Sequence, residues 1–283
     1  MVIKKLLCLV IILCSIPASI LAQEFILRPT PGEDIILAVA DIEPASNAGT
    51  SELNDAMQTF NQVLWNDLSF AGFFTMAGKS FYPSQSFGTR SVEEIPFNAW
   101  AALPFPVTFL SMGTMRLRDD VLFADLQVVD MDQRERSFGQ TITGDTSQVR
   151  EIAHQWADEI VYRLSAGASR GIASTKIAYT VKNGNTKEIF VMDYDGANPR
   201  AFTRNGALNL YPGWSRDNTK LSFASLRTGN WEVNVYSYID GTRLPFPTFD
   251  TFASTPALSP DGTRIAFTMR TSDGDHDIYV ANI

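Results

Sequence analysis

The sequence predicts an α/β domain, with a mixed sheet and flanking helices, followed by an all-β part made of repeats. In the first half, apolar residues recur at helical spacing in two long segments. In the stretch that separates these segments, apolar and polar residues alternate as in β-strands. In the second half, the segments KIAYT, KLSFA and RIAFT begin at residues 176, 220 and 264, each 44 residues after the one before. We therefore expect three divisions: a signal peptide over 1–22, an α/β domain over 23–168 and a repeat domain over 169–283.

The first 22 residues have the composition of a secretory signal peptide. Lys4 and Lys5 form a basic start, residues 6–17 are apolar, and the small residue Ala22 precedes Gln23. The apolar stretch is short for a membrane span, which needs about 20 residues. This pattern predicts export, with cleavage near Ala22 and Gln23, and a periplasmic mature protein.

Both cysteines of the chain, Cys8 and Cys14, lie inside this segment. Leu13 precedes Cys14, where a lipidated cysteine would need a small residue before it. The mature chain then holds no disulfide, and loss of two lysines takes the net charge from −8 to about −10. Phosphate contacts need Lys and Arg, so this charge argues against nucleic-acid binding.

Each element of the α/β domain has a local signal. Residues 34–40 read as a buried strand, and 72–76 as a second one. A helix starts at Thr50 or Ser51 and ends at Gly72, with one apolar face formed by Leu53, Met57, Phe60, Leu64 and Leu68.

The rest of this domain continues the same mixture. A short helix follows Pro96, and alternation over 107–131 with a polar turn at 118–120 predicts a hairpin. Residues 134–143 form a third antiparallel strand. A second amphipathic helix has Asp145 as its cap, Gly167 at its end, and an apolar face of Ile152, Trp156, Ile160 and Leu164.

The repeats predict a β-propeller. A second strand follows each repeat start, at EIFVMD (188), EVNVYS (232) and DIYVAN (277), and Asp-Gly turns follow two of these. Repeats of 40 to 45 residues with several short strands are typical of propeller blades. One blade exposes both faces and buries them only against its neighbours, so the unit must recur.

A Ser-x-Asp turn occurs twice, in WSRDNTKLSF at 214–223 and LSPDGTRIAF at 258–267. Ser and Asp bond to their own backbone in such turns, so we interpret both as structural. Trp214 and Leu258, 44 residues apart, should occupy equivalent positions in successive blades.

These segments resemble the TolB family, the periplasmic component of the Tol–Pal system. YPGWSRDNTKLSFAS and TPALSPDGTRIAF look like its propeller repeat, although WSRDN replaces the family's Trp-Ser-Pro-Asp-Gly. The first domain matches in order and spacing through ILAVADIEP, VLWNDLSFAGFFTM and REIAHQWADEIVYRLSAGASRG. The family has six blades, and the 108 residues from 176 onward make about 2.5 of them, as in a C-terminally truncated chain.

No residue pattern predicts catalysis, a cofactor or a metal. Ser169 lies in a G-x-S-x-G match, but a helix enters and a strand leaves, the reverse of a hydrolase elbow. Asp273, Asp275 and Asp277 alternate as in a calcium loop, but Ile278 stands where that loop needs glycine. Of the only two histidines, we expect His154 to be partly exposed on its helix, and neither it nor His276 has a candidate ligand nearby in sequence.

The expected function is a non-enzymatic adaptor that binds partners at the funnel mouth of the propeller. The resemblance implies that the lipoprotein Pal docks there, that TolA or other Tol proteins are further partners, and that the role is envelope integrity and constriction at cell division. The alternative is a fragment of a propeller-bearing secreted serine hydrolase without its catalytic domain. The candidate partner-binding residues, expected to be exposed on the loops before the inner strands, are Asn209, Tyr211, Phe252, Ser254 and Thr255.

Overall fold

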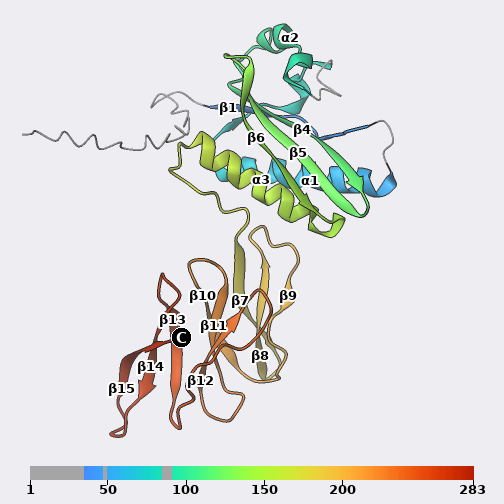
Figure 1. Ribbon diagram of the computed structural model, residues 1–283. Coiled ribbons are helices and arrows are strands. Elements are labelled where there is room, and N and C mark those ends of the chain that lie inside the picture. Colours follow the sequence, from blue (N-terminus) through green and yellow to red (C-terminus); the bar gives the residue numbers. More distant parts are fainter. Residues whose placement is uncertain (1–34, 47–49, 85–90) are drawn as a thin grey trace, which may run out of the picture.

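The computed structural model describes residues 35–46, 50–84 and 91–283, so the predicted signal peptide lies outside the described residues. No helix in these ranges combines the length and apolar character that crossing a membrane requires. The described chain has an N-terminal α/β part and a C-terminal part of three small antiparallel sheets, as the sequence predicts (Figure 1).

The α/β part is a mixed sheet in the order β3-β1-β4-β5-β6, with β2 also paired to β4. β1 is parallel to β3 and β4, whereas β5 is antiparallel to both of its neighbours, β4 and β6. The elements are β1 (Ile36–Val39), β2 (Glu43–Pro44), α1 (Ser51–Ala71), β3 (Thr75–Met76), α2 (Phe97–Ala101), β4 (Phe109–Arg118), β5 (Val121–Asp130), β6 (Glu135–Gly144) and α3 (Val149–Leu164).

Helices α1 and α3 lie side by side on one face of the sheet and enclose the larger core (Figure 1). The Thr50 side chain accepts a hydrogen bond from the Leu53 N–H, and Gly72 ends α1 with φ 68°. Asp145 forms a capping box with Gln148 on the short 3-10 turn that leads into α3. Both predicted helix starts are therefore confirmed, the second through that turn.

The C-terminal part consists of three three-stranded sheets, which we call the first, second and third sheet. The first is β7 (Lys176–Asn183), β8 (Thr186–Asp193) and β9 (Arg200–Ala201); the second is β10 (Asn209–Trp214), β11 (Lys220–Ser225) and β12 (Glu232–Ser237); the third is β13 (Ala253–Leu258), β14 (Arg264–Arg270) and β15 (His276–Asn282). Sheet faces packed on one another bury apolar clusters between them, as in a partial propeller.

The repeat is reproduced strand by strand. Trp214 pairs with Leu221, and Leu258 pairs with Ile265, so the predicted equivalence of Trp214 and Leu258 is confirmed. The Ser-x-Asp turns are structural, because the serine hydroxyl and the next threonine N–H both donate to the aspartate, at 2.5 and 3.1 Å in each copy.

The three sheets have two distinct ends. At the junction end, β7 begins and β8 stops next to α3 (Figure 1). At the opposite end, which we call the distal end, β10 and β13 begin: Asn209 lies against Lys187 at the start of β8, and Ala253 against Trp231. On β15, Ile278 and Val280 are 80% and 63% exposed, so within the described residues no other sheet covers these side chains.

Candidate functional site

The distal end carries the same backbone irregularity twice. The pairing of β10 with β11 shifts between Leu210 and Gly213, and the pairing of β13 with β14 shifts between Ser254 and Ala257. Such bulges change the direction in which a side chain points.

Tyr211 and Thr255 occupy these bulges, 44 residues apart. Their φ angles are 57° and 50°, a left-handed conformation that is uncommon for non-glycine residues and costly for a β-branched one. Both side chains are exposed, Tyr211 to 54%. Strain of about 1–3 kcal/mol per residue persists where the surroundings enforce it, and such positions cluster at functional sites.

The expectation that all five candidates are exposed was wrong for Asn209 and Ser254, which are 0% and 3% exposed. These residues belong to the inner strands rather than to loops. The Asn209 amide donates to the Lys187 carbonyl at 2.9 Å and to Glu188 Oε2 at 3.0 Å, which joins the second sheet to the first. Phe252 is half-buried, with its ring 5.1 Å from that of His276.

The junction end holds a cluster that sequence reasoning missed. His154 is buried at 1% exposure, not partly exposed as expected, and its Nδ1 lies 2.6 Å from Oδ2 of Asp67 on α1. Tyr194, from the turn after β8, donates its hydroxyl to Asp67 Oδ1 at 2.5 Å. Burial is the main cause that raises the pKa of the Tyr194 hydroxyl, and this hydrogen bond is the second. One buried carboxylate therefore ties both helices of the α/β part to the first sheet.

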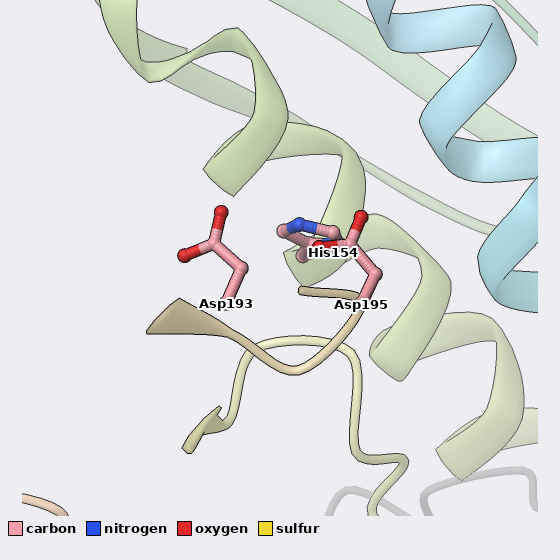
Figure 2. A group of neighbouring side chains, drawn as sticks. All are labelled: His154, Asp193 and Asp195. Carbon is pink, nitrogen blue, oxygen red and sulfur yellow. The ribbon is translucent and has the colours of Figure 1, made fainter. Parts of the chain in front are cut away.

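His154, Asp193 and Asp195 also form the one group of possible metal ligands within the described ranges (Figure 2). The carboxylates already have donors: Lys176 and Asn198 reach Asp193 at 2.6 and 2.8 Å, while Arg150 pairs with Asp195.

Burial by itself would raise the pKa of the Asp193 carboxyl, but the hydrogen bonds from Lys176 and Asn198 outweigh it and lower the pKa. With an arginine and a lysine beside the two carboxylates, the cluster is an ion-pair network that joins the two parts of the chain. We assign it no metal.

The segment between α3 and β7 is fixed by one carboxylate. Asp158 accepts hydrogen bonds from the Ala173 and Ser174 N–H groups, both at 2.8 Å. Gly171 passes so close that a Cβ there would lie 2.0 Å from Asp158 Oδ1. The Ser169 hydroxyl accepts from the Gly171 N–H at 3.2 Å, in a connection that runs from helix to strand.

Comparison with known proteins gives consistent matches. The family model described as PD40, TolB beta propeller domain, matches residues 164–283. The Tol-Pal system protein TolB of Bordetella pertussis is 33% identical over 189 residues, 66% of this chain and 41% of that protein. The one of Desulfosudis oleivorans is 24% identical over 283 residues, 99% of this chain and 63% of that protein.

A solved structure, TolB from Acinetobacter baumannii, shares the fold with a TM-score of 0.66 at 21% identity. The match covers 89% of this chain and 59% of that one. The chain thus spans less than two thirds of the length of these relatives.

The chain is a two-part propeller protein. The last helix of its α/β part leads into propeller sheets, and strained, exposed residues recur at the distal end of those sheets. The match to the propeller model, and the relative that aligns with 99% of this chain, identify which propeller proteins it is similar to. Residues 164–283 match the TolB beta propeller domain, and the chain is similar over nearly its whole length to TolB proteins.

Proposed function

We propose that the chain is a non-enzymatic periplasmic adaptor of the Tol–Pal system, which binds the outer-membrane lipoprotein Pal through the distal end of its sheets. In this role it supports envelope integrity and outer-membrane constriction at cell division, with TolA or other Tol proteins as further partners. The proposal draws on relatives named Tol-Pal system protein TolB. In this proposal the chain has two domains, one over 23–168 and one over 169–283, and the second binds the partner.

One observation carries the proposed site: Tyr211 and Thr255 are both exposed and both strained, at equivalent points of two neighbouring inner strands. Tyrosine offers a rigid aromatic surface with a polar tip, a type enriched among residues that dominate binding energy. Phe252 immediately precedes β13, three residues before Thr255. The Asn209 and Ser254 side chains are buried, so a partner would not contact them directly.

The test is binding to purified Pal by Tyr211→Ala and Thr255→Arg variants. Truncation of a dominant interface residue costs about 2 kcal/mol or more, roughly a thirtyfold loss of affinity. Both variants should melt like the parent, because neither side chain belongs to a core. Ile239→Ala is the matched control: Ile239 is 80% exposed but follows β12 at the junction end, so its loss should leave binding unchanged. Unchanged binding by both distal variants would move the interface elsewhere.

A further inference from the structure

A pocket of about 180 Å³ opens between the first and second sheets, near the distal end. Its apolar wall is aromatic: the rings of Phe223 and Tyr236 stack at 5.5 Å, and Phe202 meets Tyr236 edge-on at 5.8 Å. An equivalent aromatic pair lies between the second and third sheets, where Phe246 and Phe267 follow Phe202 and Phe223 by 44 residues.

The polar lining of this pocket departs from the repeat. Ser225 is 2% exposed, and its hydroxyl has no hydrogen-bond partner in the described chain. The residues 44 positions before and after it are Val181 and Met269, both apolar. An unpaired buried hydroxyl is unfavourable, so the second sheet keeps a polar group where its neighbours avoid one.

Asn234 departs in the same way, on the same face of the sheet. It pairs with Phe223, is 4% exposed, and its amide donates only a long 3.4 Å hydrogen bond to the Glu232 carbonyl. The residues at this position in the first and third sheets are Phe190 and Tyr279. Two adjacent buried polar substitutions in one sheet indicate a site that receives a polar group.

Two arginines, Arg204 and Arg227, also line the pocket, together with Thr203 and Asn205. Both arginines are exposed, and within the described residues neither makes an ion pair or a hydrogen bond. The nearby acids are already engaged: Glu188 accepts from Thr203 and the Gly206 N–H, and Glu232 accepts from Thr228. Unpaired guanidinium groups beside a buried hydroxyl and amide favour an anion at this position, although the chain as a whole is acidic.

We propose that this pocket binds the carboxylate of an aspartate or glutamate side chain presented by a protein partner. The carboxylate pairs with Arg204 and Arg227 and accepts a hydrogen bond from Ser225, while the neighbouring residue of the partner packs on the aromatic wall. This inference rests on the proposed docking of a partner at the distal end, and it names the chemistry of that contact.

The pocket is tested first without any partner. N-acetyl-Phe-Glu-amide and N-acetyl-Phe-Gln-amide are titrated into the isotope-labelled protein, and the Nε–H signals of the arginines are followed by NMR. The glutamate probe should shift Arg204 and Arg227 saturably, with about tenfold tighter binding than the glutamine probe. Equal binding of the two probes, or of inorganic phosphate and the glutamate probe, would overturn the assignment. Ser225→Val, which copies Val181, should fold normally and bind the glutamate probe more weakly.

The contact is then tested with purified Pal. The double variant Arg204→Ala, Arg227→Ala should bind Pal about tenfold more weakly and with a flatter salt dependence. The control is Arg216→Ala, because Arg216 is also exposed and also lacks a partner among the described residues, but lies in the Ser215–Thr219 turn at the junction end. If the double variant binds Pal as tightly as the parent does, the carboxylate contact is rejected and the adaptor role stands. If the glutamate probe binds but the parent does not bind Pal, the pocket stands and the proposed partner is wrong.

Discussion

Tyr194→Phe removes a single hydroxyl from the junction between the α/β part and the first sheet. That hydroxyl donates a 2.5 Å hydrogen bond to Asp67, which is 3% exposed. Hydrogen bonds to charged groups contribute about 1.5–3 kcal/mol, and the variant leaves a buried acceptor short of a donor. The ring stays, and it keeps its contacts with His154 and Phe70 at 5.6 and 5.9 Å. We expect the free energy of unfolding to fall by about 2 kcal/mol.

The assay is a urea titration followed by tryptophan fluorescence, with Tyr179→Phe as the matched control. Tyr179 lies on β7 of the same sheet, and its hydroxyl has no hydrogen-bond partner in the described part of the chain. Its loss should change stability by no more than about 0.5 kcal/mol. Equal costs for the two variants would refute the argument that the hydroxyl joins the two parts.

The same change should alter the response to alkaline pH. Burial and then the Asp67 hydrogen bond raise the pKa of Tyr194 above its ordinary value of 10.0. The unfolded chain therefore ionises this residue first, so its contribution to stability is complete below pH 10 and is lost as the pH rises above that value. Tyr194→Phe should lose less stability than the parent over this range, and identical alkaline profiles would contradict the assignment.

Three further outcomes are expected. Gly171→Ala should lower the free energy of unfolding by about 1–3 kcal/mol, because φ is +74° and the new Cβ would meet Asp158; an unchanged urea midpoint would contradict this. Leu221→Ala, at 0% exposure between the first and second sheets, should cost about 2–5 kcal/mol, and a thermal scan that shows no drop in Tm would rule out tight packing there. Hydrogen bonds, mainly from the Ser259 hydroxyl and then from the Thr263 N–H, lower the pKa of Asp261 to about 2. The contribution of Asp261 to stability is therefore present above pH 3.8 and lost as the pH falls towards 2. Asp261→Asn should remove this acid-dependent part, as urea midpoints at pH 6 and pH 3 would reveal; equal pH dependence in both proteins would count against the turn.

Elements with a local signal could be predicted from the sequence. The faces of α1 and α3 are set by spacings of three and four residues, and their caps by Thr50 and Asp145, all within one segment. The equivalence of Trp214 and Leu258 followed from a spacing of 44.

What failed depended on contacts between distant residues. His154 meets Asp67 across 87 positions, and Tyr194 meets Asp67 across 127, so no local pattern marks any of the three. Asn209 was assigned to an exposed loop because the alternation that defines a strand is interrupted by the bulge at Tyr211. Ser225 and Asn234 of the inter-sheet pocket show only as departures from the repeat, and these become visible once the strand registers fix the equivalent positions.

The turn that anchors the first sheet is itself one copy of a repeated turn. In the second sheet the corresponding turn ends at Asp240 and Gly241, and Ile239 stands in the place of Tyr194 with 80% of its surface in water. Tandem repeats gain and lose copies when a gene recombines with itself, because neighbouring units share sequence. A copy deleted or inserted after β9 would leave the anchorage of Tyr194 on Asp67 intact. Replacement of the first copy by the second would put an isoleucine where the buried carboxylate needs a donor. The first copy is therefore not interchangeable with the second, because the domain that it adjoins needs a hydrogen-bond donor at this position.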